Sequence, residues 1–233
     1  MIPAKAEYSH ERLEIMRPQF KSRFCLSFFL LAAFMLWTAA VRTVDVQPIG
    51  PLGSSVGFAT LNLTVHQAIG VNMTLYTLTD WLSLAPLIIV AGFGLLGLGQ
   101  WIRRKSIRKV DFTILALGGF YIVVLAVFLL FEELAINYRP VLIGGVLEAS
   151  YPSSTTMLVM CVVPTAMMQL HTRIRNRLLR RWANGVLAVF LLFMVLGRIL
   201  SGVHWITDVI GGALLSAGLV ALYRAICTLT PNP

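Results

Sequence analysis

Six long apolar runs alternate with short polar connections along the chain. Each run is close to the roughly 20 residues that an α-helix needs to cross the hydrocarbon core of a bilayer. We therefore predict an all-α integral membrane protein in which six transmembrane helices form one bundle, and residues 1–233 make a single membrane domain. The predicted spans are about 24–41, 80–101, 112–131, 154–171, 183–201 and 205–226.

The longest connection, residues 42–79, has a pattern of its own. Its first part is rich in proline, glycine and serine, which is typical of turns. Four apolar residues then recur near helical spacing: Phe58, Leu61, Val65 and Ile69. This spacing predicts a short helix on the membrane surface. His66 lies in it, and we interpret it as a satisfied or solvated histidine.

Small residues recur three or four positions apart in the second and sixth spans. They are Gly92, Gly94, Gly97 and Gly99 in the former, and Gly211, Gly212, Ser216 and Gly218 in the latter. Because such residues let helices approach closely in lipid, we interpret both sets as packing surfaces.

The composition agrees with a membrane protein. The chain is 58% hydrophobic and only 12% charged, whereas a soluble domain is about 25% charged. The first apolar run has no convincing cleavage site, so we expect a retained span rather than a signal peptide. Cys25, Cys161 and Cys227 lie in or at the ends of spans, which indicates neither a disulfide framework nor a metal cluster.

The net charge of +9 is concentrated in three blocks of lysine and arginine, at residues 5–23, 103–109 and 173–181. With six spans, these blocks and Arg224 lie on one side of the membrane, which the positive-inside rule assigns to the cytoplasm. We therefore expect both termini to be cytoplasmic, and the short loops suit a bacterial cytoplasmic membrane. The distribution indicates topology and contact with anionic lipid, not nucleic-acid binding.

Three polar segments fall together on the opposite, non-cytoplasmic side: residues 137–140, 151–155 and 198–208. Ionisable residues at a membrane edge are costly and typically functional. Arg139 and Arg198 stand where the positive-inside rule least expects basic residues. Two guanidinium groups near His204 indicate an anion to be held, and their planar donors suit phosphate.

Two of these segments contain helix starts. Pro152, Ser153 and Ser154 predict the beginning of a helix, whose first N–H groups have no intrahelical partner and can bind phosphate. His204 and Asp208 are four residues apart. If the last span begins near Val203, the two side chains share one helix face and can form a hydrogen bond.

These residues resemble the three signature motifs of the type 2 phosphatidic acid phosphatase superfamily. The family patterns are K-x6-R-P, P-S-G-H and S-R-x5-H-x3-D. The chain has Arg139-Pro140, then Pro152-Ser153, then Arg198-x5-His204-x3-Asp208. The resemblance runs from the third to the sixth span, and the six-span layout is similar to that of the membrane members.

The resemblance implies a mechanism without metal or cofactor. His204 would attack phosphorus and form a phosphohistidine, and Asp208 would orient its ring. The phosphoryl oxygens would be held by four residues: Arg139, Arg198, Ser153 and Ser154. Water would then hydrolyse the intermediate.

The chain departs from the family patterns at four positions. Glu132 replaces the lysine of the first motif, Ser154 the glycine of the second, and Gly197 the serine of the third. Thr155 replaces the histidine that, in the family, protonates the leaving group. Threonine cannot act as a general acid near neutral pH, and losing such a group costs about 10²–10⁴-fold in rate.

The missing acid bears on the substrate. An alcohol leaving group needs a proton, because its pKa is roughly 15, like that of water. A lipid phosphate leaving from a diphosphate has a second pKa of about 6 and can depart unassisted. We therefore favour a polyprenyl-type diphosphate. Glu132, Glu133 or Glu148 could instead supply a proton, although a salt bridge is the favoured role for each.

The favoured function is hydrolysis of a lipid-linked phosphate or diphosphate at the outer face of a membrane. A phosphatidic acid or phosphatidylglycerophosphate phosphatase is one alternative. A non-hydrolytic protein that binds lipid phosphates or other membrane proteins is another. A small transporter is disfavoured, because no charged residue lies in the middle of a span. The oligomeric state is not predicted.

Overall fold

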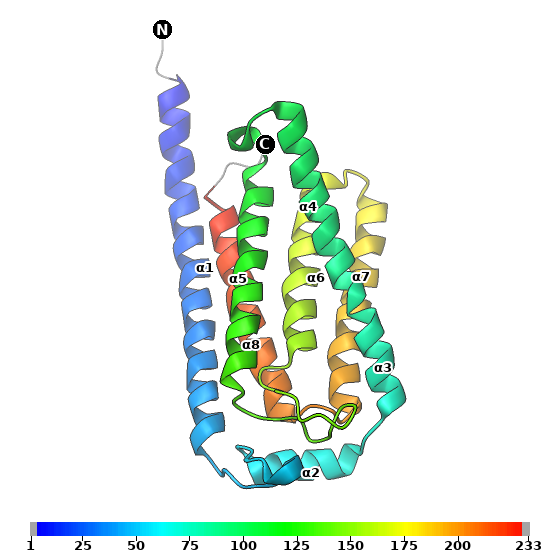
Figure 1. The fold of residues 1–233 in the computed structure, drawn as a ribbon. Helices are drawn as coiled ribbons and strands as arrows, with labels where there is room; N and C mark the ends of the chain where they lie inside the picture. Colours follow the sequence, from blue (N-terminus) through cyan, green and yellow to red (C-terminus); the bar gives the residue numbers. More distant parts are fainter. Residues whose placement is uncertain (1–3, 230–233) are drawn as a thin grey trace.

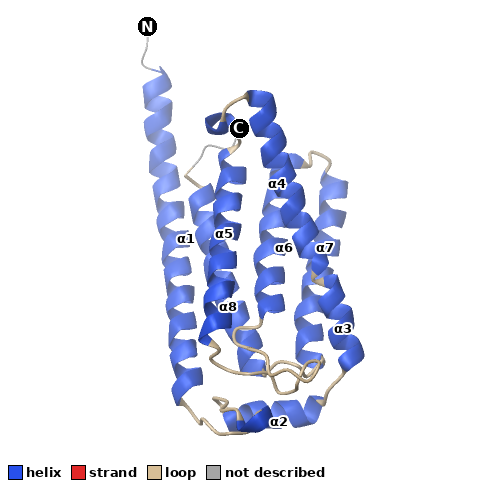
Figure 2. Cartoon of the chain, viewed as in Figure 1, coloured by secondary structure: helices blue, strands red, loops and turns tan. Residues whose placement is uncertain are grey.

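The chain is all-helical over residues 4–229, which the computed structural model describes, with side chains described from Pro18 onward (Figure 1). The helices are α1 (Ala4–Thr43), α2 (Ala59–Ile69), α3 (Met73–Leu82), α4 (Leu84–Arg104), α5 (Phe112–Leu134), α6 (Ser154–Arg173), α7 (Arg177–Leu200) and α8 (Ile206–Cys227). Two short 3-10 turns, η1 (Pro51–Gly53) and η2 (Ile107–Lys109), lie in the connections. Between residues 4 and 229 no strand forms (Figure 2).

Five segments are long and apolar enough to cross a membrane: Pro18–Thr43, Met73–Arg104, Phe112–Leu134, Arg177–Leu200 and Ile206–Cys227. They correspond to five of the six predicted spans. The second begins at Met73 rather than near residue 80, because α3 leads directly into α4 at Ser83. The protein is therefore a multi-pass membrane protein.

The remaining predicted span, 154–171, is the fourth along the chain and coincides with α6, which is not among these five segments. Helix α6 packs against α4, α5, α7 and α8 in the interior of the bundle (Figure 1). Thr156, Thr165 and Gln169 on this helix are buried against protein. A helix enclosed in this way does not need a lipid-facing apolar surface, so the number of six spans remains a prediction.

Glycines of α8 lie at close helix contacts, as the sequence predicts. A Cβ on Gly218 would lie 2.7 Å from the Leu31 side chain of α1, and Ser27 Oγ donates a hydrogen bond of 2.9 Å to the Gly218 carbonyl. A Cβ on Gly211 would lie 2.6 Å from the Tyr151 ring. These small residues let α1 and the 151–153 segment approach the α8 backbone.

The same interpretation is wrong for most of α4. A Cβ on Gly92, Gly94 or Gly99 would meet no atom within 4 Å, and only Gly97 faces a neighbour, Ile114. Helix α4 lies at the edge of the bundle (Figure 1). Within the described part of the chain, this set of glycines therefore approaches a neighbouring helix, α5, only at Gly97.

Helix α2 confirms the helix predicted from the apolar residues at 58–69, and it crosses one end of the bundle (Figure 1). Asn62 ties it to the start of α8, since its Nδ2 donates to Thr207 Oγ1 at 2.9 Å. The buried Asn62 side chain also donates to the Gly57 carbonyl at 2.7 Å. Helix α2 therefore covers the connection between α7 and α8.

The basic segments gather at the end of the bundle opposite α2. The α4–α5 and α6–α7 connections, the start of α1 and the end of α8 all lie there (Figure 1). Asp111 links two basic segments through ion pairs with Arg104 at 2.8 Å and Arg173 at 3.5 Å. The side chains of Lys5, Arg12 and Arg17, in the first block, lie outside the described residues. The cytoplasmic location of this end remains a prediction.

Substitution of Gly218 by alanine should destabilise the α1–α8 contact. The new Cβ would meet Leu31 at 2.7 Å, and overpacking of this kind costs about 1–3 kcal/mol. We expect a lower melting temperature for the purified protein in detergent. Gly94→Ala is the matched control, because its Cβ meets nothing within 4 Å. Equal melting temperatures for the two variants would contradict the packing interpretation.

Candidate active site

The 135–153 connection brings two site residues together by backbone pairing. The Ser150 N–H donates to the Asn137 carbonyl at 2.8 Å, and the Arg139 N–H donates to the Glu148 carbonyl at 3.1 Å. The two arms of this loop therefore run antiparallel. As a result, Arg139 on one arm and Ser150 on the other both reach the same histidine.

That histidine is His204, which lies just before α8 rather than on it. The helix begins at Ile206, so the predicted direct hydrogen bond between His204 and Asp208 on one helix face is wrong. Ser150 Oγ lies between them instead. It is 2.9 Å from His204 Nδ1 and donates to Asp208 Oδ2 at 2.5 Å.

This bridge determines the tautomer of His204. A serine hydroxyl has one proton, and here it is directed to the carboxylate. The Nδ1–H of His204 must therefore donate to Ser150 Oγ, which leaves the lone pair on Nε2. Nε2 lies 3.3 Å from Arg139 Nη1. The nitrogen that can attack a substrate is thus the one beside an arginine.

Asp208 is the fully buried carboxylate of the site. Besides Ser150, its oxygens accept hydrogen bonds from Asn137 Nδ2 at 3.2 Å and from the Trp205 N–H at 3.1 Å. It lies in the first turn of α8, where the helix dipole favours negative charge. Its carbonyl accepts the Ser153 N–H at 3.0 Å. Asp208 therefore joins both loops and the start of α6.

The two predicted phosphate-binding arginines converge on one aromatic ring. The guanidinium carbons of Arg198 and Arg139 lie 4.9 and 5.8 Å from the centroid of Tyr76, on α3. Arg139 Nε is 3.0 Å from Glu148 Oε2, so Glu148 has the ion-pairing role expected from the sequence. The two positive charges thus stand side by side near His204.

Arg198 is buried but only partly satisfied. Its side chain is 1% exposed, and its Nη2 donates to Asp80 Oδ1 at 2.9 Å. Its Nε and Nη1 have no hydrogen-bond partner among the described residues. Leaving buried charged donors unpaired is costly. An anion with several acceptor oxygens would relieve that cost.

The surroundings keep His204 neutral. Burial, together with the positive charges of Arg139 and Arg198, lowers the pKa of His204 well below its usual value. A neutral imidazole retains the Nε2 lone pair at neutral pH. The same positive charges attract a phosphate anion to this nitrogen.

The start of α6 is where the sequence predicts it. The helix begins at Ser154, and no side chain caps its first N–H groups. Ser153 is fully buried, and its Oγ accepts a hydrogen bond from Thr156 Oγ1 at 3.0 Å. The Ser153 N–H donates to the Asp208 carbonyl, so this turn lies against the start of α8.

A cavity of about 560 Å³ lies between α4, α5 and α6 beside the site. Its walls are mostly apolar, with Leu87, Val124, Phe128 and Leu158 among them. Four polar residues line it as well: Asp80, Ser83, Ser154 and Thr155. Asp80 also pairs with Arg198, so one residue of the cavity wall contacts the arginine cluster.

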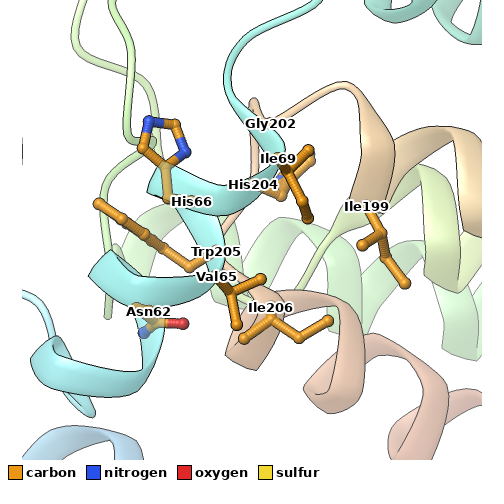
Figure 3. A pocket seen from close by; sticks show the side chains of 9 residues that line it. All are labelled: Asn62, Val65, His66, Ile69, Ile199, Gly202, His204, Trp205 and Ile206. Atoms are coloured by element: carbon orange, nitrogen blue, oxygen red, sulfur yellow. The ribbon is translucent and has the colours of Figure 1, made fainter.

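A second, water-sized space of about 10 Å³ lies under α2, with His66 and His204 among its lining residues (Figure 3). The His66 ring centroid is 5.4 Å from that of Trp205. Burial lowers the pKa of His66, and its Nδ1 is buried without a partner among the described residues. The ring is therefore not satisfied by the protein at Nδ1, and because the residue is only partly buried its interpretation as a solvated histidine stays a prediction.

Three residues of the site are absent from the sequence prediction: Ser150, Tyr76 and Asp80. Ser150 lies two residues before Pro152, the first residue of the second motif, and its hydroxyl is the only sequence signal of its role. Tyr76 and Asp80 are four residues apart on α3 and so share one face. The described residues contain no group of three histidine, cysteine, aspartate or glutamate side chains suited to hold a metal ion.

The shifted pKa of His204 predicts a pH effect on stability. The unfolded histidine takes up a proton as the pH falls below about 6.5, whereas the folded one resists it. The contribution of His204 to stability should therefore decrease below pH 6.5, by up to about 1.4 kcal/mol per pH unit. His204→Gln should weaken this dependence in thermal melts between pH 7.5 and 5.5. His171→Gln, which changes an exposed histidine at the far end of α6, should not; equal slopes in all three proteins would refute the assignment.

Comparison with known proteins identifies the fold and the family. The chain matches the crystal structure of the first transmembrane PAP2 type phosphatidylglycerolphosphate phosphatase from Bacillus subtilis, with a TM-score of 0.61 and 18% sequence identity, over 88% of this chain and 97% of that one. No curated protein sequence matches the chain. The sequence model of the PAP2 superfamily matches residues 87–228, more than half of the chain and all three motifs. The chain therefore belongs to the PAP2 superfamily.

Proposed function

We propose that the protein hydrolyses a lipid-linked phosphate or diphosphate through a phosphohistidine formed on His204. One observation carries the proposal. The lone pair of His204 Nε2 faces Arg139, while Nδ1 is hydrogen-bonded to Ser150, whose hydroxyl is in turn bonded to Asp208. The superfamily membership and the likeness to a membrane phosphatase support lipid phosphate phosphatase activity.

In this mechanism the phosphoryl group lies between Nε2 and the two arginines. Nε2 attacks phosphorus, and the bond to the leaving oxygen breaks on the opposite side, since attacking and leaving atoms are in line. Arg139 and the unpaired donors of Arg198 hold the equatorial oxygens. Ser153 and Ser154 add the open N–H groups at the start of α6. No metal or cofactor takes part.

The cavity between α4, α5 and α6 is the place we assign to the lipid chain. Its apolar walls suit a hydrocarbon, and Thr155 lines it. The leaving oxygen would then lie near Thr155, which cannot protonate it. This favours a diphosphate of polyprenyl type, whose leaving lipid phosphate needs no proton. Phosphatidic acid and phosphatidylglycerophosphate are the alternative substrates.

We also propose the orientation in the membrane. Helix α6 lies alongside its neighbours within the bundle (Figure 1). We infer that it also crosses the membrane, which brings the number of spans to six. The basic end would face the cytoplasm, with both termini. His204 and α2 would then face outward, from a bacterial cytoplasmic membrane. The expected partners are the lipid and the membrane itself.

The substrate preference can be tested with purified protein in detergent and a chelator of divalent metals. We expect phosphate release from a polyprenyl diphosphate to be at least about tenfold faster than from phosphatidic acid, because only the second leaving group requires a proton. Equal or faster release from phosphatidic acid would refute the preference. Binding without release from either lipid would favour the non-hydrolytic alternative.

Replacement of His204 by alanine should abolish phosphate release, because the attacking nitrogen is lost. The assay is phosphate release from the best substrate of the wild-type protein. His171→Ala is the control, since His171 is exposed at the other end of α6. Release that survives in His204→Ala would exclude the proposed nucleophile.

Replacement of Ser150 by alanine should lower kcat by about 10- to 100-fold. The variant removes the hydrogen bond that orients Nδ1 and leaves the Asp208 carboxylate with one donor fewer. Ser150→Thr retains a hydroxyl and should recover part of the rate. Full activity in Ser150→Ala would show that the bridge has no role in catalysis.

A further inference from the structure

The second half of the proposed reaction needs a water molecule that the family motifs of this chain do not activate. Once the lipid has left, water must attack the phosphohistidine. An in-line displacement places this water opposite His204 Nε2, in the space that the leaving group vacated. In the proposed arrangement Thr155 lies on that side, because it lines the cavity assigned to the lipid chain, and it cannot serve as a base near neutral pH.

Asp80 lies on the same side. It lines the cavity assigned to the lipid chain, together with Ser154 and Thr155, and it is the one ionisable carboxylate among the described residues of that lining. Its Oδ1 is also 2.9 Å from Arg198 Nη2. One carboxylate therefore contacts both the arginine that would hold the phosphoryl group and the space where the water must stand.

The other carboxylates nearby are less suited to this task. Asp208 is fully buried and accepts three hydrogen bonds from Asn137, Ser150 and Trp205. Glu148 is paired with Arg139 and does not line the cavity. The Asp80 side chain is 57% exposed, so other protein atoms leave its carboxylate accessible to a water molecule.

We propose that Asp80 is the general base for hydrolysis of the phosphohistidine, an inference that rests on the proposed function. The water oxygen forms a bond to phosphorus, and the bond from phosphorus to His204 Nε2 breaks. The electron pair of that bond returns to Nε2, which restores the neutral imidazole. One water proton passes to the Asp80 carboxylate and then to solvent, while the other stays on the phosphate product.

The ion pair with Arg198 explains why Asp80 serves the second step and not the first. A carboxylate paired with an arginine is ionised, so it can accept a proton but has none to give. It cannot replace the missing histidine as an acid for the leaving group. Asp80 is therefore compatible with a substrate whose leaving group departs unassisted.

The test is a rapid-quench experiment on Asp80→Asn, with farnesyl diphosphate carrying ³²P in its terminal phosphate. We expect the first turnover, measured as formation of labelled protein, to be within about threefold of the wild-type rate. Steady-state phosphate release should fall by about 10²-fold or more, since a general base contributes 10²–10⁴-fold. Acid-labile labelled phosphohistidine should accumulate in the variant and not in the wild-type protein.

Two variants accompany this experiment. Asp80→Glu keeps the carboxylate and the charge opposite Arg198, so it should release phosphate at least about tenfold faster than Asp80→Asn. If Asp80→Asn does not fold, Asp80→Glu should still show slower release than labelling, because its carboxylate is displaced. Glu133→Gln, at an exposed carboxylate near the end of α5 that does not line the cavity, is the control and should behave as the wild type.

The outcomes separate this inference from the proposed function. If Asp80→Asn slows labelling and release equally and no phosphohistidine accumulates, Asp80 only positions Arg198, and the inference is overturned. Unchanged release in the variant overturns it as well. If the wild-type protein releases phosphate from neither farnesyl diphosphate nor phosphatidic acid, or if His204→Ala is as active as the wild type, the proposed function itself fails.

Discussion

The buried carboxylate of Asp208 is the interaction on which the rest of the site depends. It has no exposure to solvent, and its oxygens accept hydrogen bonds from Asn137, Ser150 and the Trp205 N–H. A buried charge is strongly unfavourable unless such donors surround it. The 135–153 connection and the α7–α8 connection must therefore both be ordered for α8 to pack. The folding of α8 and the placement of His204 are, for this reason, one event.

Arg198 shows the opposite balance. Its charge is buried as deeply as that of Asp208, yet Nε and Nη1 lack partners in the described chain. Each unmade hydrogen bond of a buried donor costs about 1–3 kcal/mol. Asp80 and the ring of Tyr76 hold the guanidinium in place without using these donors. The guanidinium donors are thus oriented in advance, which is how an enzyme lowers the cost of binding charge in its transition state.

The sequence was sufficient for the helices that face lipid and for the residues of the motifs, because both leave local patterns. It was misleading where tertiary packing determines the exposure of a helix or the position of its first residue. Helix α6 is enclosed by other helices, so its polar residues weaken the signal of a span. Helix α8 begins at Ile206 and not near Val203, because the Asp208 carboxylate accepts the Trp205 N–H in a capping box that starts the helix there. Ser150 and Asp80 reach their partners across 54 and 118 residues, distances at which no sequence periodicity operates.

The identity of residue 155 links these observations to the choice of substrate. In a two-step displacement, the leaving group departs from the side of the phosphorus opposite the histidine, and the water later attacks from that same side. A histidine there can give a proton in the first step and take one in the second. Thr155 can do neither, and on our proposal Asp80 does only the second. The protonation states on that side would then select substrates by the basicity of the leaving group, whatever the shape of the lipid chain in the cavity.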